Sequence, residues 1–211
     1  NNYASLGFNV ADGATSQGFI TYSRGGDHVG KFVFSQRTGS TNYATQMTIG
    51  ETGVVTTQDM TVNGVTVGKG KGNLNTVLGD GALSANTTGG DTVAVGNGAL
   101  RLNDTGGRNT AVGYNSLTKA TNVKENTAIG WGCLAKATEG SVNTAVGDSA
   151  LTQCETGGYN VAVGNASLTS LISGDQNVGI GRSAGNQLTT GSNVICIGYN
   201  SNASSPTVNN E

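Results

Sequence analysis

The residues best suited to catalysis or metal binding are few and far apart in this chain. The single histidine, His28, follows Asp27, and the three cysteines are Cys133, Cys154 and Cys196, with no CxxC or Cys/His spacing. A structural zinc site needs about four ligands, which these residues cannot supply together. We therefore expect no metal, no cofactor and free buried thiols. We expect His28 and Asp27 to form a turn rather than a catalytic pair.

The carboxylates are poorly placed for glycoside hydrolysis, which needs two of them about 5–9.5 Å apart. Asp80 and Asp148 occupy the same position in a repeat, but four repeats separate them, which is roughly 19 Å in stacked β structure. A nucleophile–histidine pair cannot form within residues 71–202, because they contain no histidine. The sequence thus predicts no catalytic residues and no enzyme. A polysaccharide-degrading site assembled between chains stays open as the less favoured alternative.

Composition excludes two classes of partner. The 211 residues hold 11 Lys and Arg against 13 Asp and Glu, a net charge of −2, so no basic surface is expected to bind nucleic acid. No apolar run approaches the ~18–20 residues of a membrane helix, so no membrane insertion is expected.

The composition changes near residue 70. All four Phe, both Met and the only His lie before residue 61, in short segments rich in Val, Ile, Thr and Tyr that alternate with turn sequences. We predict an all-β chain with an antiparallel β module at residues 1–70, a repeat region at 71–202 and a tail at 203–211.

The repeat region has a constant period of 17 residues. Glycines recur at this step at Gly79, Gly96, Gly113, Gly130, Gly147, Gly164, Gly181 and Gly198. A unit this short is typical of one coil of a β-solenoid, because helical repeats need more than 30 residues. Coils stacked at ~4.8 Å would give a rod of roughly 34 Å. The glycines are expected where φ is positive or backbones crowd.

Two columns of equivalent residues flank these glycines on the N-terminal side. The branched column is Leu78, Val95, Val112, Ile129, Val146, Val163, Ile180 and Ile197. The small column, one residue earlier, is Val77, Ala94, Ala111, Ala128, Ala145, Ala162, Gly179 and Cys196. We expect the branched column to face the core, so the alternation of a strand turns the small column outward. An uncharged outward strip of Ala predicts a close seam between chains, hence a parallel homotrimer, with a monomeric solenoid as the alternative.

Two further columns test the stacking. An asparagine ladder is expected along the axis at Asn75, Asn109, Asn126, Asn143, Asn160 and Asn177. Asp91, Arg108 and Glu125 lie five residues before successive glycines, so stacking would bring opposite charges together on the surface.

The post-glycine column, one residue after each glycine, is chemically mixed and is therefore expected to face water. It reads Asp80, Asn97, Tyr114, Trp131, Asp148, Asn165, Arg182 and Tyr199. Tyr114 and Trp131 would be neighbours, and adjacent aromatic faces can stack on sugars. They are the first receptor-binding candidates, with Arg182 and Tyr199 near the C-terminal end as the second. Shielding of the backbone or packing at the rim of a trimer is the alternative role.

The units NTAVGYNSL, NTAIGWGCL and NTAVGDSAL resemble repeats in the C-terminal parts of bacteriophage tail fibres. The lead-in MTVNGVTVGKGKGNLNT resembles the stretch before such repeats, and SNASSPTVNNE the segment before their self-cleaving intramolecular chaperone of the endosialidase type. The resemblance covers residues 59–211.

This resemblance implies a homotrimeric fibre of the virion that is assembled in the host cytoplasm and acts extracellularly. Its partner would be a host cell-surface glycan or outer-membrane receptor. It also implies that the chain ends where a C-terminal chaperone begins. The Ser-Asp…Arg-Asp-Lys pattern of the chaperone is absent, so we expect the chaperone either to be released by cleavage at or shortly after Glu211 or to lie outside this sequence. A weaker resemblance is to the head repeats of trimeric autotransporter adhesins, whose units are usually shorter.

Overall fold

The chain is described from a computed structural model that covers residues 74–211 in full and, before them, the backbone of seven strands. These strands are β1 (Tyr3–Asn9), β2 (Gln17–Arg24), β3 (Gly30–Arg37), β4 (Tyr43–Gly50), β5 (Gly53–Thr56), β6 (Met60–Val62) and β7 (Val65–Gly68). His28 lies outside the described residues. The chain divides into two units, Asn1–Met60 and Thr61–Glu211.

The first unit contains one sheet, in which β1 to β5 pair in chain order. Every pairing is antiparallel, and a register shift between Phe34 and Ser35 interrupts the pairing of β3 with β4.

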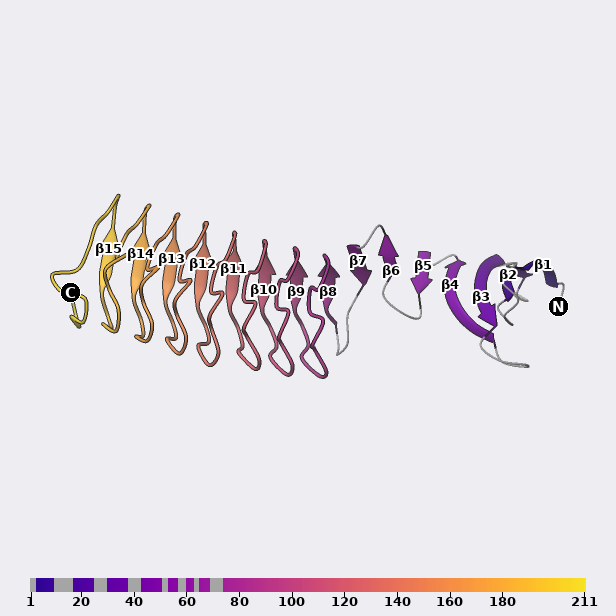
Figure 1. Cartoon of the computed structure of the whole chain (residues 1–211), viewed down its shortest axis with the longest axis horizontal. Helices are drawn as coiled ribbons and strands as arrows, with labels where there is room; N and C mark the ends of the chain where they lie inside the picture. Colours follow the sequence, from indigo (N-terminus) through magenta and orange to yellow (C-terminus); the bar gives the residue numbers. More distant parts are fainter. Residues whose placement is uncertain are drawn as a thin grey trace. The chain divides into compact units, whose positions relative to one another are not determined.

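The second unit is mainly a parallel β-solenoid with one short strand in each coil (Figure 1), and β7 pairs antiparallel with the first of these strands. The strands are β8 (Thr76–Leu78), β9 (Val93–Val95), β10 (Thr110–Val112), β11 (Thr127–Ile129), β12 (Thr144–Val146), β13 (Val161–Val163), β14 (Val178–Ile180) and β15 (Ile195–Ile197). Each pairs with the next at an offset of 17 residues, as Ala111 does with Ala128. The predicted solenoid and its period are confirmed. The described residues contain no helix, and hence none that could span a membrane.

Backbone crowding explains the constant glycine. The eight glycines have φ between 116° and 142°, a region that only glycine adopts without strain. A Cβ on Gly96 would lie 2.5 Å from the carbonyl oxygen of Gly113 in the next coil. Both predicted reasons for glycine, positive φ and close approach, therefore apply.

The small column faces the interior of the coil, so the prediction that it faces outward is wrong. Ala94, Ala111 and Ala128 are fully buried, whereas Ile129 is 40% exposed and Ile197 63% exposed. The coil is too narrow for a large side chain at the small column. Even a Cβ on Gly179 would lie 2.6 Å from Ser167 Oγ. The side chains of the small column are small because the core is narrow. The branched column points away from the core.

The rest of the core consists of stacked identical positions. Leu100, Leu117, Leu134 and Leu151 are fully buried and have φ of 49–51°, so each also turns the chain. Residues after β15 continue the hydrogen-bonded stack, since the N–H of Thr189 donates to the carbonyl of Pro206 (2.7 Å).

The predicted asparagine ladder is confirmed. Asn143 is buried, and its Nδ2 donates to the carbonyl oxygen of Gly157 (2.9 Å), three residues before Asn160 in the next coil. Its Oδ1 accepts the backbone N–H of Asn160 in the next coil (3.0 Å). The ladder thus ties the inner turn of each coil to the coil that follows.

Candidate functional site

The post-glycine column forms a continuous exposed line along the solenoid, as the sequence predicts. All eight of its side chains are exposed. Each follows a glycine of positive φ, and this turn directs the next residue away from the core. The stacking of coils then places chemically different side chains side by side in register.

Contacts divide this column into four successive pairs. Asn97 Nδ2 donates to Asp80 Oδ2 (3.1 Å), and Asn165 Nδ2 donates to Asp148 Oδ2 (3.0 Å). The Tyr114 and Trp131 rings lie with centroids 6.1 Å apart and planes 11° from parallel. The Arg182 guanidinium lies 5.6 Å from the centroid of the Tyr199 ring. Hydrogen-bonded polar pairs therefore alternate along the axis with pairs that contain an aromatic ring.

Tyr114 and Trp131 come together as the sequence predicts. They are 49% and 55% exposed, so about half of each large side chain is open to solvent. Two nearly parallel rings on successive coils form an apolar area beside hydrogen-bonding groups. This combination suits the apolar face and the hydroxyls of a sugar ring.

Arg182 and Tyr199 also meet, in the last two coils that carry a strand. Tyr199 is 73% exposed, and the arginine lies within the range of a cation–π contact. The contact holds the long arginine side chain against the surface, so these residues form a second, smaller exposed pair.

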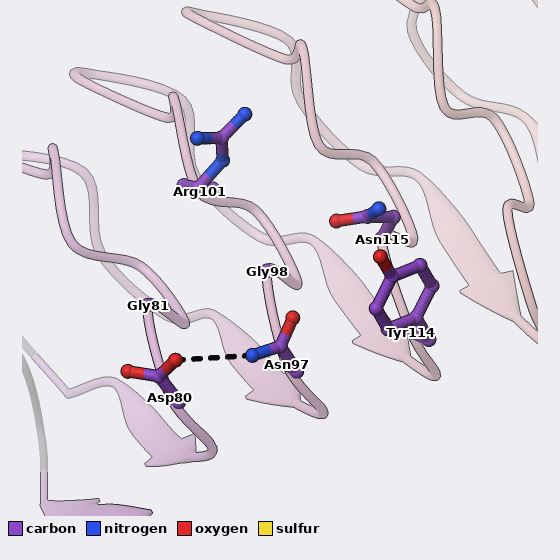
Figure 2. Close-up of a pocket in the computed structure, with 7 residues that line it drawn as sticks. All are labelled: Asp80, Gly81, Asn97, Gly98, Arg101, Tyr114 and Asn115. Carbon is purple, nitrogen blue, oxygen red and sulfur yellow. Dashed lines mark hydrogen bonds between the residues drawn. The ribbon is translucent and has the colours of Figure 1, made fainter. Parts of the chain in front are cut away.

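An open pocket of about 350 Å³ adjoins Tyr114 (Figure 2). Its lining comes from three successive coils: Asp80, Gly81, Asn97, Gly98, Arg101, Tyr114 and Asn115. The sequence interpretation did not find this pocket, although Arg101 gives a clue to it. Arg101 is the one charged residue in a column otherwise made of Ser84, Thr118, Ala135, Thr152, Thr169, Asn186 and Ala203.

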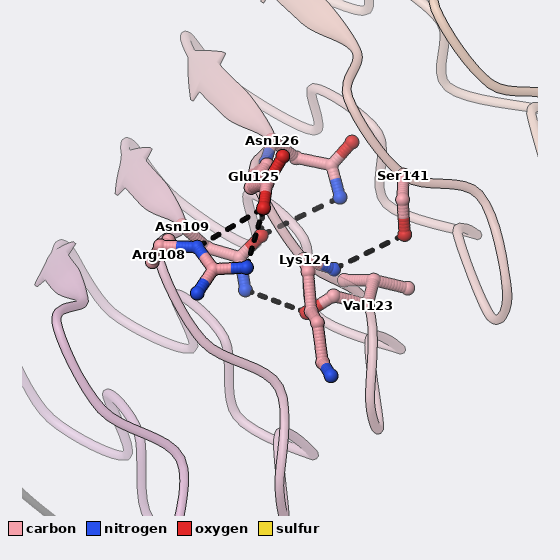
Figure 3. A network of polar contacts seen from close by, with 7 residues as sticks. All are labelled: Arg108, Asn109, Val123, Lys124, Glu125, Asn126 and Ser141. Atoms are coloured by element: carbon pink, nitrogen blue, oxygen red, sulfur yellow. Dashed lines mark hydrogen bonds and ion pairs between the residues drawn. The ribbon is translucent and has the colours of Figure 1, made fainter.

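The predicted charge column is observed in part. The Arg108 guanidinium forms an ion pair with Glu125, and its Nε donates to Glu125 Oε1 at 3.0 Å (Figure 3). Both side chains are about half exposed, so the pair contributes little to stability. Within residues 74–211 the structure gives no ion pair between Asp91 and Arg108.

The thiols are free and buried, as expected. Burial raises the pKa of the Cys133 and Cys154 thiols from 9.0 to about 11, and it raises the pKa of Cys196 as well. Such thiols are poor nucleophiles at neutral pH, because the reactive thiolate is scarce. In the part of the chain that the structure describes, no three His, Cys, Asp or Glu residues cluster as metal ligands.

Comparisons of the chain with known protein families, with curated proteins and with solved structures give no match.

Proposed function

We propose that this chain is a structural and receptor-binding segment of a trimeric viral tail fibre, which attaches a phage to the surface of its host. The observation that carries the proposal is the exposed branched column on the outer face of strands β8–β15. A soluble chain that remained alone would leave this strip in water.

The outer strip supports parallel association of three chains. Leu78, Ile129, Val163, Ile180 and Ile197 are 37–63% exposed, and the strands between them place smaller β-branched residues in the same line. Because every coil repeats the same face at the same spacing, parallel copies could meet along the whole solenoid. The seam is thus proposed at the branched column, in place of the buried alanines.

The post-glycine column supports contact with a receptor. It offers exposed aromatic and polar side chains in fixed register on a scaffold whose successive coils are joined by several rows of backbone hydrogen bonds. Rigid presentation lowers the entropy lost on binding. A host-surface glycan is the proposed ligand, because paired aromatic rings next to amide and carboxylate groups match the two kinds of surface on a sugar.

Mass and cell binding test this proposal together. We expect the purified chain to run as a trimer that resists SDS, to show a three-chain mass by light scattering, and to bind bacterial cells. Trp131→Ala should leave the mass unchanged and weaken cell binding. Tyr159→Ala is the matched control, since Tyr159 is an exposed aromatic outside the post-glycine column.

A monomeric mass with intact β structure would contradict the fibre proposal, and unchanged binding of Trp131→Ala would remove the aromatic pair as the contact. A trimeric bacterial adhesin head would bind cells or matrix of another organism instead of bacteria. A tailspike would release reducing ends from host polysaccharide during the same incubation.

A further inference from the structure

The pocket beside Tyr114 combines features that the rest of the post-glycine column lacks. The Asp148–Asn165 pair repeats the Asp80–Asn97 pair four coils later, but Thr169 there replaces Arg101 and Arg182 replaces Tyr114. An aromatic ring, a carboxylate and a guanidinium thus adjoin one cavity only at the first pair.

Two glycines, Gly81 and Gly98, contribute to the lining of this pocket. Gly98 has φ of 69°, and a Cβ there would lie 2.3 Å from Asn115 Oδ1. A Cβ on Gly81 would lie 3.9 Å from Arg101 Cδ, so the arginine side chain extends over this glycine. A side chain at Gly98 would therefore displace Asn115, which also lines the pocket.

The charge of Arg101 is available to a ligand. Arg101 is exposed, and its guanidinium has no ion pair or hydrogen bond among residues 74–211, where the Arg108–Glu125 pair is the one ion pair. Asp80, by contrast, already accepts a hydrogen bond from Asn97. Figure 2 shows Arg101 on the other side of the pocket from the Asp80–Asn97 pair.

We propose that this pocket binds an acidic sugar, and this inference rests on the proposed attachment to host glycans. The planar guanidinium of Arg101 would donate paired hydrogen bonds to a carboxylate or phosphate on the sugar. Tyr114 would contact the apolar face of the sugar ring. The Asp80 carboxylate would accept a hydrogen bond from a hydroxyl group at the end of the sugar ring far from the anionic group. At that distance the negative charge of the sugar would repel the carboxylate least.

The two ends of the pocket thus favour a sugar whose anion and hydroxyl groups lie on opposite sides. A neutral sugar could use Asp80, Asn97 and Tyr114 but would leave the guanidinium without its matched acceptor. The selectivity for acidic over neutral sugars is therefore assigned to Arg101.

An array of immobilised oligosaccharides tests this assignment. It holds uronic acids, sialic acids and sugar phosphates, each beside its neutral form with the carboxyl reduced or the phosphate removed. We expect the full chain to bind acidic members and Arg101→Gln to weaken that binding about tenfold or more, because a charge-assisted bidentate contact is lost. Arg101→Lys, which keeps the charge but not the fork, should give an intermediate loss.

Arg108→Gln is the matched control and should bind as the unmodified chain does. Its arginine is paired with Glu125 and lies outside the pocket lining. Equal binding to neutral and acidic members, or unchanged binding by Arg101→Gln, would overturn the assignment while leaving attachment to glycans in place. Absence of binding to every member would also overturn it, and the cell-binding assay then decides separately whether the proposed attachment function fails.

Discussion

Single residues fix the path of each coil through backbone conformations that most amino acids avoid. Gly147 has φ of 130°, and a Cβ there would lie 2.6 Å from the carbonyl carbon of Gly164. Gly132 has φ of 62°, but a Cβ there would meet nothing within 4 Å. The energetic cost of a positive φ can therefore be measured separately from the cost of steric overlap between coils, at two glycines of the same solenoid.

We expect Gly147→Ala to destabilise the chain by about 3 kcal/mol or more, since it adds backbone overlap to a strained φ. Gly132→Ala should cost about 1 kcal/mol, the strain of a left-handed conformation alone. Thermal or denaturant unfolding of both variants measures the difference. Equal losses would show that backbone crowding between coils is not what requires glycine.

Because the thiols are buried, the free energy of unfolding should depend on pH in the alkaline range. A thiol whose folded pKa lies above its unfolded value stabilises the fold below the unfolded value and loses that contribution as pH rises through the folded value. For Cys133 and Cys154 the window runs from 9.0 to about 11. The melting temperature should therefore fall across this window.

Alanine at both cysteines isolates this effect from other groups that titrate nearby. Cys133 shares its column with Ala99 and Ala150, and Cys154 shares its column with Ala137, so alanine is compatible with both sites. Between pH 9 and 11, the melting temperature of the Cys133→Ala, Cys154→Ala variant should fall less than that of the unmodified chain. Parallel curves would mean that the thiols do not ionise with unfolding.

At the scale of the element, the asparagine ladder replaces side-chain packing with hydrogen bonds on one wall of the coil. Asn143 Nδ2 donates to Gly157, and Asn143 Oδ1 accepts from Asn160. Asn143→Val would leave these buried partners unsatisfied, and we expect a loss of about 2–4 kcal/mol. Asn143→Thr should lose less, since Thr92 occupies the equivalent position naturally. Denaturant midpoints compare the two, and a smaller loss for valine would contradict the ladder's role.

The sequence was sufficient for the period, the glycine positions, the ladder and the exposed post-glycine column, because each depends on register alone. The orientation of the strands could not be read in the same way. Alternation says that Ala111 and Val112 face opposite sides, but not which side is inside. Hydrophobicity favoured valine as the side chain inside the coil, whereas the narrow interior admits alanine instead. The width of that interior depends on contacts such as those around Gly179.

The pocket was also beyond sequence reasoning, for a different reason. Its lining joins residues from three coils and three columns, so it depends on how far Arg101 reaches across Gly81. The repeat period of the sequence predicts which residues stack on one another. It does not predict whether the surface between two columns of side chains forms a pocket. The single charge in the Arg101 column was the one trace of it in the sequence.

At the scale of the whole molecule, the proposed seam and the proposed sugar pocket make separable contributions to attachment. The seam uses the branched column, whereas the pocket lining contains none of its residues. Ile129→Glu with Ile180→Glu would place charges in the seam, and we expect the light-scattering mass to fall from three chains to one. Lys119→Glu, an exposed change outside the seam, should leave the mass unchanged.

The separated chain should keep its affinity for a soluble acidic oligosaccharide and lose about 100-fold or more in apparent affinity for cells. The reason is that parallel copies hold several pockets near one surface, so that later contacts form at high effective concentration. Calorimetry with the oligosaccharide and binding to whole cells measure the two quantities on one sample. If the oligosaccharide affinity also fell while far-ultraviolet circular dichroism stayed unchanged, the pocket would need a neighbouring chain to be complete. If the mass remained that of a trimer, the branched column would not be the seam.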